Sequence, residues 1–158
     1  MPHQHPTLNA KDLRGLEANH QGLLRVCLDL EQAMDELGHD TPQTDLRRLA
    51  DSIVQCLKEA HDLEERILFP DFDRRAGSCF SAMIIEQLKA EHRYDSLAAE
   101  ELSLTLRALT EGRCRLSFET IVCMLGGFLE CLRRHVSTEK LMIEALLVAE
   151  AEGREIFA

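Results

Sequence analysis

Four histidines and two glutamates have the residue types and the spacing of a metal site. They are His20, His61, Glu65, His92, His135 and Glu139. Each glutamate follows a histidine by four positions, at Glu65 and Glu139, and in a helix such a pair lies on one face. Neutral imidazoles and carboxylates suit iron or manganese, and six of them are enough for two ions with bridging carboxylates. A single zinc ion would leave two ligands unused.

Four long segments could position these residues. Turn-like stretches at 38–43 (GHDTPQ), 70–78 (PDFDRRAGS) and 110–115 (TEGRCR) separate them, and we predict helices over residues 10–37, 43–69, 79–110 and 116–151. Leu, Ala, Glu and Arg are common, while Gly and Pro are scarce. Short connections place successive helices antiparallel. We therefore predict an all-α, up-down-up-down antiparallel four-helix bundle, with residues 1–158 as a single domain.

Each predicted helix has one histidine in the apolar stripe that should face the core. The three-four spacing places His20 in line with Leu16 and Leu23, for example. All four histidines lie about 17 or 18 residues from the same end of the bundle, so at roughly 1.5 Å per residue they should share one layer. Buried carboxylates cost several kcal/mol each unless something cationic compensates them. The alternative is a metal-free network of hydrogen bonds between the histidines and glutamates.

Three further acidic residues lie beside the motif, and each has more than one candidate role. Asp95 lies in the stripe one turn after His92, where it could bind metal, hydrogen-bond a ligand histidine or face water. Asp62 and Glu64 flank the first histidine-glutamate pair, and we expect both at a solvated helix edge in preference to a role in supporting the ligand histidines.

Charge and composition bear on partners and location. The formal net charge of -10, without a basic stripe, argues against nucleic acid and anionic membranes as partners. No apolar run is long enough to span a bilayer and the N-terminal residues form no apolar signal region, which indicates a cytoplasmic protein. The six cysteines form no CxxC pair and are expected to be free thiols.

The combined motif resembles that of the hemerythrin-like (HHE cation-binding) proteins. The resemblance rests on an early histidine, on His61 with Glu64, Glu65 and the LFP of 68–70, on a histidine after Glu91, and on a final HxxxE. It covers about residues 8–150. It implies a non-haem di-iron centre of two iron ions, which can carry an oxo bridge. By this resemblance the four histidines are terminal ligands, and Glu65 and Glu139 are bridges.

Two positions differ from the oxygen-carrying hemerythrins. Ser96 stands where their third helix has a second histidine, and Lys140 stands where their last motif has an aspartate. The pattern is closer to the di-iron variants with two HxxxE pairs, of the iron-centre repair and iron-sensing types. With only four histidines, we expect two at each iron and exchangeable positions at both.

The resemblance implies a protein that binds or reacts with nitric oxide or oxygen in sensing or stress defence. One alternative is a redox protein that donates or oxidises iron, as in iron-centre repair. Another is an interaction module that depends on iron. The sequence contains no catalytic triad, phosphate-binding loop or nucleophilic-cysteine motif, and whether the protein is an enzyme stays open.

Overall fold

The computed structural model describes residues 8–39 and 44–153, and the regular elements in these ranges are all helical. This confirms the predicted all-α class. The elements are α1 (Ala10–Glu36), α2 (Leu46–Leu63), the π-helical turn η1 (Glu64–Leu68), α3 (Phe69–Ala76), α4 (Cys79–Thr110) and α5 (Phe118–Glu152). Polar caps begin the long helices: the side chains of Asn9, Asp45, Ser78 and Ser117 each accept a hydrogen bond from a first-turn N–H. The predicted turn at 38–43 falls mostly outside the described residues.

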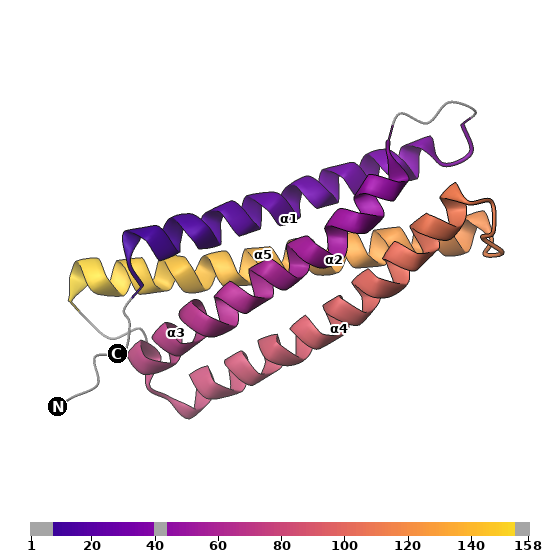
Figure 1. The fold of residues 1–158 in the computed structure, drawn as a ribbon. Coiled ribbons are helices and arrows are strands. Elements are labelled where there is room, and N and C mark those ends of the chain that lie inside the picture. The colour runs from indigo at the N-terminus through magenta and orange to yellow at the C-terminus, as the bar shows by residue number, and fades with distance from the viewer. Residues whose placement is uncertain (1–7, 40–43, 154–158) are drawn as a thin grey trace.

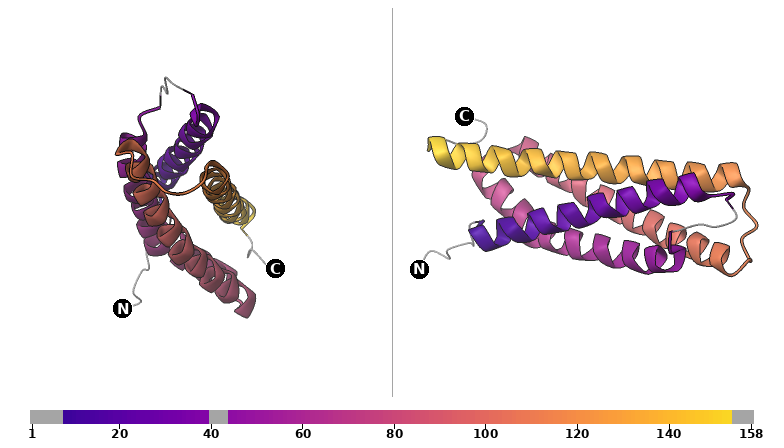
Figure 2. Two further views of the ribbon diagram at one scale, coloured as in Figure 1. Left: turned by 90° about the vertical axis from the view of Figure 1, so that its right-hand side faces the viewer. Right: turned by 90° about the horizontal axis from the view of Figure 1, so that it is seen from above.

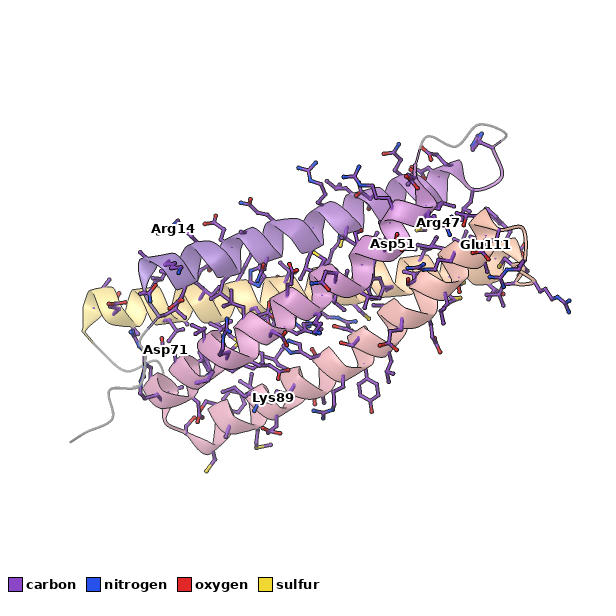
Figure 3. The ribbon with its side chains drawn as sticks, in the orientation of Figure 1. Arg14, Arg47, Asp51, Asp71, Lys89 and Glu111 are labelled. Atoms are coloured by element: carbon purple, nitrogen blue, oxygen red, sulfur yellow. The ribbon has the colours of Figure 1, made fainter. Side chains whose placement is uncertain are left out.

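The prediction of a turn over 70–78 is wrong for most of its length. Helix α3 continues almost directly from η1, and only Gly77 and Ser78 separate it from α4. Pro70 lies in the first turn of α3, directly after Phe69, whose N–H bonds to the Glu64 carbonyl across η1, so the helix is continuous through the proline. The buried Asp71 pairs with Arg74 and Arg75 of the same helix, and its position is labelled in Figure 3.

The long helices pack side by side as a four-helix bundle (Figure 1). Helix α2 lies between α1 and α4, and α5 packs against α1 and α4. The end-on view in Figure 2 shows α4 diverging from α5 toward one end of the bundle. In the described residues, no helix is both long enough and apolar enough to cross a bilayer.

Two apolar clusters form the core, and a polar layer lies between them along every long helix. The larger cluster contains the buried apolar residues of α1 from Leu23 onward, and the smaller cluster contains Leu16. His20 lies between these two residues in the sequence, and it is buried. The same order holds in α4, where His92 falls between Leu88 of the smaller cluster and Ala99 of the larger one. The predicted single layer of histidines is confirmed.

Candidate metal centre

The layer contains two groups of potential ligand atoms that share one residue. His61, Glu64, His92 and His135 form the first group, and His20, Glu64 and Glu139 form the second. We call them the three-histidine group and the one-histidine group. Within each group the ligand atoms lie within 4.8 Å of one another, and every member is buried. Glu64 belongs to both groups, which is the position of a bridging carboxylate.

The three imidazoles of the first group converge. The Nε2 atoms of His92 and His135 are 3.0 Å apart, and the rings of His61 and His92 stack with centroids 3.8 Å apart. Two ring nitrogens at this distance, both directed at the centre, would repel each other if both carried a proton. A cation between them would instead accept both lone pairs.

The two inner carboxylates connect the groups. Oε2 of Glu139 lies 3.1 Å from Nε2 of His20, and Oε1 of Glu139 lies 3.0 Å from Nε2 of His135. The two oxygens of Glu64 lie 3.3 Å from Nε2 of His20 and Nε2 of His92, respectively. Each carboxylate therefore reaches histidines of both groups, one with each oxygen.

Five of the six predicted ligands meet in this layer, and the sixth does not. Glu65 is 42% exposed in its side chain, whereas Glu64 is fully buried. The prediction that Glu64 lies at a solvated edge is wrong, and the even division of two histidines to each metal also differs from the structure. His61 joins His92 and His135, which leaves His20 alone with the carboxylates.

The side of α2 that faces the core explains why Glu64, and not the predicted Glu65, lies in the metal layer. Ala60 is fully buried and His61 nearly so, which means that the side of α2 facing the core is centred between these two residues. Four residues after Ala60 comes Glu64, and the next steps of four reach Leu68 and Phe72, which are also buried. In a regular α-helix each step of four drifts by about 40°. The π turn η1, in which the Phe69 N–H bonds to the Glu64 carbonyl, absorbs this drift. The repeated spacing of four was the available signal in the sequence.

The outward-facing ring nitrogens have their own partners. Oε1 of Glu65 lies 2.7 Å from Nδ1 of His92, and Oδ2 of Asp95 lies 3.2 Å from Nδ1 of His135. The Ser96 hydroxyl lies 3.4 Å from Nδ1 of His61. These contacts orient the three imidazoles so that Nε2 points inward in each. Of the roles considered for Asp95, contact with a ligand histidine agrees with this position, as a charge pair without hydrogen-bond geometry.

The charges of the layer are strongly coupled. Burial alone would lower the pKa of His20 and of His92, but their contacts with Glu139 and Glu64 outweigh burial and raise both pKa values to about 9. Burial likewise opposes the charge on His135, yet Asp95 and the inner carboxylates raise its pKa to about 12. Burial and the neighbouring His92 lower the pKa of His61 to about 4.

The pKa of Glu64 shifts in the opposite direction to those of its histidine neighbours His20, His92 and His135. Burial would raise its pKa, but its contacts with His135, His20 and His92 outweigh burial and hold the pKa well below the usual range. Glu64 is therefore an anion at the centre of the layer, with cationic neighbours.

Several buried atoms have no hydrogen bond in the described structure. Those that face the centre of the metal layer are Nε2 of His61 and both oxygens of Glu64, whose contacts with histidine nitrogens lack hydrogen-bond geometry. Nδ1 of His135, on the outward side of its ring, is a further one in this layer. Buried polar atoms are nearly always satisfied, so unpaired atoms that face a common centre indicate a missing partner. Nitrogen and carboxylate donors without thiolate suit iron or manganese. The residues thus fit a metal centre better than a metal-free network.

A pocket leads from the surface to the three-histidine group. It lies between α2 and α4 and has a volume of about 530 Å³, and its wall includes His61, His92 and Ser96. Lys58 and Arg93 also line it. A second pocket, of about 570 Å³, lies between α4 and α5 and reaches Asp95 and His135.

Asp95→Asn should weaken metal binding about 10- to 100-fold, because a neutral amide holds the His135 ring less firmly. The measurement is metal affinity by competition with a chelator, together with the ring NMR signals of His135. Glu91→Gln is a matched control, since Glu91 precedes Asp95 by one turn and bonds Gln87 instead of a histidine. Equal affinities of the two variants would show that Asp95 does not position His135.

Comparison with known proteins gives one match. The family model described as hemerythrin HHE cation-binding domain matches residues 12–147. The search of curated proteins gave no match, and neither did the search of solved structures. The matched range contains all six residues of the two ligand groups and covers most of the chain. The chain belongs to the hemerythrin HHE cation-binding family.

Proposed function

We propose that this chain is a non-haem di-iron protein whose centre binds a small diatomic molecule, nitric oxide or oxygen, in sensing or stress defence. The observation that carries the proposal is the pair of ligand groups that share Glu64. One iron would be held by the three-histidine group and the other by the one-histidine group, with Glu64 and Glu139 between them. Such carboxylate-bridged pairs are an established use of helical-bundle cores.

The two irons would not be equivalent. The three-histidine group offers four residues and the one-histidine group offers three, and the second is richer in carboxylates. Neither group supplies the six ligands of an octahedral ion with one atom from each residue, so each iron should retain exchangeable positions. When bound, the irons would supply open coordination positions and redox chemistry.

The protein's own residues would control access and charge. The pocket between α2 and α4 reaches His61 and His92 and does not reach His20, so a small molecule would arrive on the side of the three-histidine group. The small Ser96 side chain lies in that wall and contacts His61. The two buried carboxylates balance cationic charge at the centre, while Glu65 and Asp95 hold His92 and His135 in place.

The test is anaerobic loading with ferrous iron. We expect two irons per chain, with two Mössbauer environments of equal area, and binding of nitric oxide by optical titration. Ser96→Leu should narrow the pocket and slow nitric oxide binding; because Ser96 also contacts His61, the rates are compared at matched iron content. Thr138→Leu, in the pocket between α4 and α5, is the matched control and should leave the rate unchanged.

Other results would count against this function. A single tightly bound metal, or two identical environments, would contradict the unequal pair. Two irons that do not bind nitric oxide would retain the metal centre and overturn the role in diatomic binding. Equal slowing by the two leucine variants would contradict entry between α2 and α4.

A further inference from the structure

Phe69 contacts a candidate metal ligand although it offers no ligand atom itself. Its ring is buried in the smaller apolar cluster and stacks on the imidazole of His92, with the ring centroids 5.3 Å apart and the planes 24° apart. His61 stacks on the same imidazole at 3.8 Å. Among the described ring contacts Phe69 has none with His61, so these two rings lie on opposite faces of His92. His92 is therefore the middle ring of a stack of three.

The stack fixes a property of His92 that its polar contact leaves open. Oε1 of Glu65 lies 2.7 Å from Nδ1 of His92, and this contact holds the outward edge of the ring. The lone pair that would bind metal lies in the ring plane at Nε2, so a tilt of the plane directs it away from the centre. Rings packed on both faces resist that tilt. The buried cluster around Phe69 keeps its ring from following such a movement.

The main chain of Phe69 acts on the shared carboxylate. Its N–H donates to the carbonyl of Glu64, which closes the π turn η1. In a regular α-helix, a residue five positions after Glu64 would lie about 140° around the helix from it, so the two side chains would point in widely different directions. Here both are buried, Glu64 at 0% exposure and Phe69 at 1%. Burial of the phenyl ring thus stabilises the same π turn that leaves Glu64 in the metal layer.

We propose that Phe69 is a positioning residue of the metal centre. Its ring keeps the plane of His92 directed at the three-histidine group, and its burial stabilises the π turn that places Glu64 in both groups. Figure 1 shows how one residue can do both, because α3, which begins at Phe69, continues the line of α2 beside α4. The inference rests on the metal centre of the proposed function and is independent of which small molecule that centre binds.

The first test compares Phe69→Leu with Phe72→Leu. Both replace a buried phenylalanine of the smaller cluster, but among the described ring contacts Phe72 has none with the histidines of the layer. Ferrous-iron affinity, measured by competition with a chelator, should fall roughly two- to tenfold in Phe69→Leu, the factor that corresponds to the loss of one aromatic pair. It should be unchanged in Phe72→Leu, although urea unfolding of metal-free protein should show that both variants lose stability.

The NMR signals of the His92 ring give a readout that a loss of stability alone does not change. In metal-free wild type, the phenyl ring of Phe69 should shift the ring protons of His92 upfield, because they lie over its face. This part of the shift should disappear in Phe69→Leu and remain in Phe72→Leu.

The role of burial is tested with Phe69→Ala and its matched control Phe72→Ala. Without a large side chain to bury at position 69, the π turn loses stability, so hydrogen exchange of the amide at that position should quicken. Iron content after gel filtration should fall below two per chain. Phe72→Ala should retain both ions and the protected amide, and so should Phe69→Leu, which still buries a large apolar side chain. Circular dichroism verifies that each variant is folded.

Three results would decide against these roles. Equal iron affinities of wild type and Phe69→Leu, or an equal loss in the two leucine variants, would overturn the role of the ring. An amide that stays protected in Phe69→Ala would overturn the role of its burial. A chain that takes up two irons but does not bind nitric oxide would overturn the proposed function and leave all of these differences between variants unchanged.

Discussion

Glu64→Gln should lower the iron content from two per chain to well under one, whereas Glu65→Gln should retain both ions with weaker binding. Glu64 is fully buried, belongs to both ligand groups and lies 3.3 Å from histidines of each. Its amide analogue would lose the negative charge that a shared ligand supplies to two cations. Glu65 is partly exposed and contacts only the outward nitrogen of His92. Its loss should cost about 10- to 100-fold in affinity.

The two variants form a matched pair, because the residues are adjacent and the substitutions are the same. Iron is measured by elemental analysis after anaerobic loading and gel filtration, and circular dichroism verifies that both variants are folded. The reverse outcome, in which Glu65→Gln loses both ions and Glu64→Gln retains them, would make Glu65 the shared ligand, as the helical periodicity predicts. Retention of one iron by Glu64→Gln would show that the two groups bind independently.

Metal-free protein should lose stability as pH rises, and iron-loaded protein should not. His20 and His92 have their pKa raised from 6.5 to about 9 in the folded chain, so their contribution is complete below 6.5 and is lost as pH rises toward 9. One pKa unit corresponds to about 1.4 kcal/mol, so the loss amounts to several kcal/mol. His61 acts oppositely. Its lowered pKa means that stability falls as pH drops from 6.5 toward 4. The metal-free maximum should therefore lie near the ordinary imidazole pKa.

Bound iron should reverse the pH dependence of stability on the alkaline side, because a metal binds neutral imidazole and competes with protons. Metal affinity should rise with pH, and the stability gap between loaded and metal-free protein should widen from about pH 6 to about pH 8. Urea unfolding of both forms under anaerobic conditions measures the gap. A metal-free chain that becomes more stable over this range would show that His20 and His92 are already neutral in the folded protein.

The histidines could be predicted from sequence because each is the one histidine in an otherwise apolar stripe, and because helix length alone sets its depth. Their grouping could not be predicted in this way. The position of each histidine along its helix predicts that the four rings share a layer, but it does not predict which helices approach most closely across that layer. The structure brings the histidines of α2, α4 and α5 together and leaves His20 of α1 with the carboxylates.

Two local features were misread for identifiable reasons. Positions three and four after a histidine lie within about 100° of each other on a helix, so His61 alone does not distinguish Glu64 from Glu65. The burial of Ala60 decides between them, and a small apolar residue carries little signal in a sequence. Pro70 resembles a helix end, but in the first turn of α3 it is compatible with a helix. The aromatic residues Phe69 and Phe72, both buried, were the evidence that the segment continues into the core.

The π turn η1 also affects how this chain can tolerate insertions and deletions. A π turn holds one residue more than an α turn, so in the gene it is equivalent to a single inserted codon. Loss of one codon within 65–67 would convert the Glu64–Phe69 hydrogen bond into an ordinary α-helical one, so the helix on either side would keep its register and Asp71 and Phe72 their place in the core. Loss of one codon from a regular part of α2 would instead rotate all that follows by about 100°. This chain should therefore tolerate a single-residue deletion in η1 better than one in the α-helical segment before it.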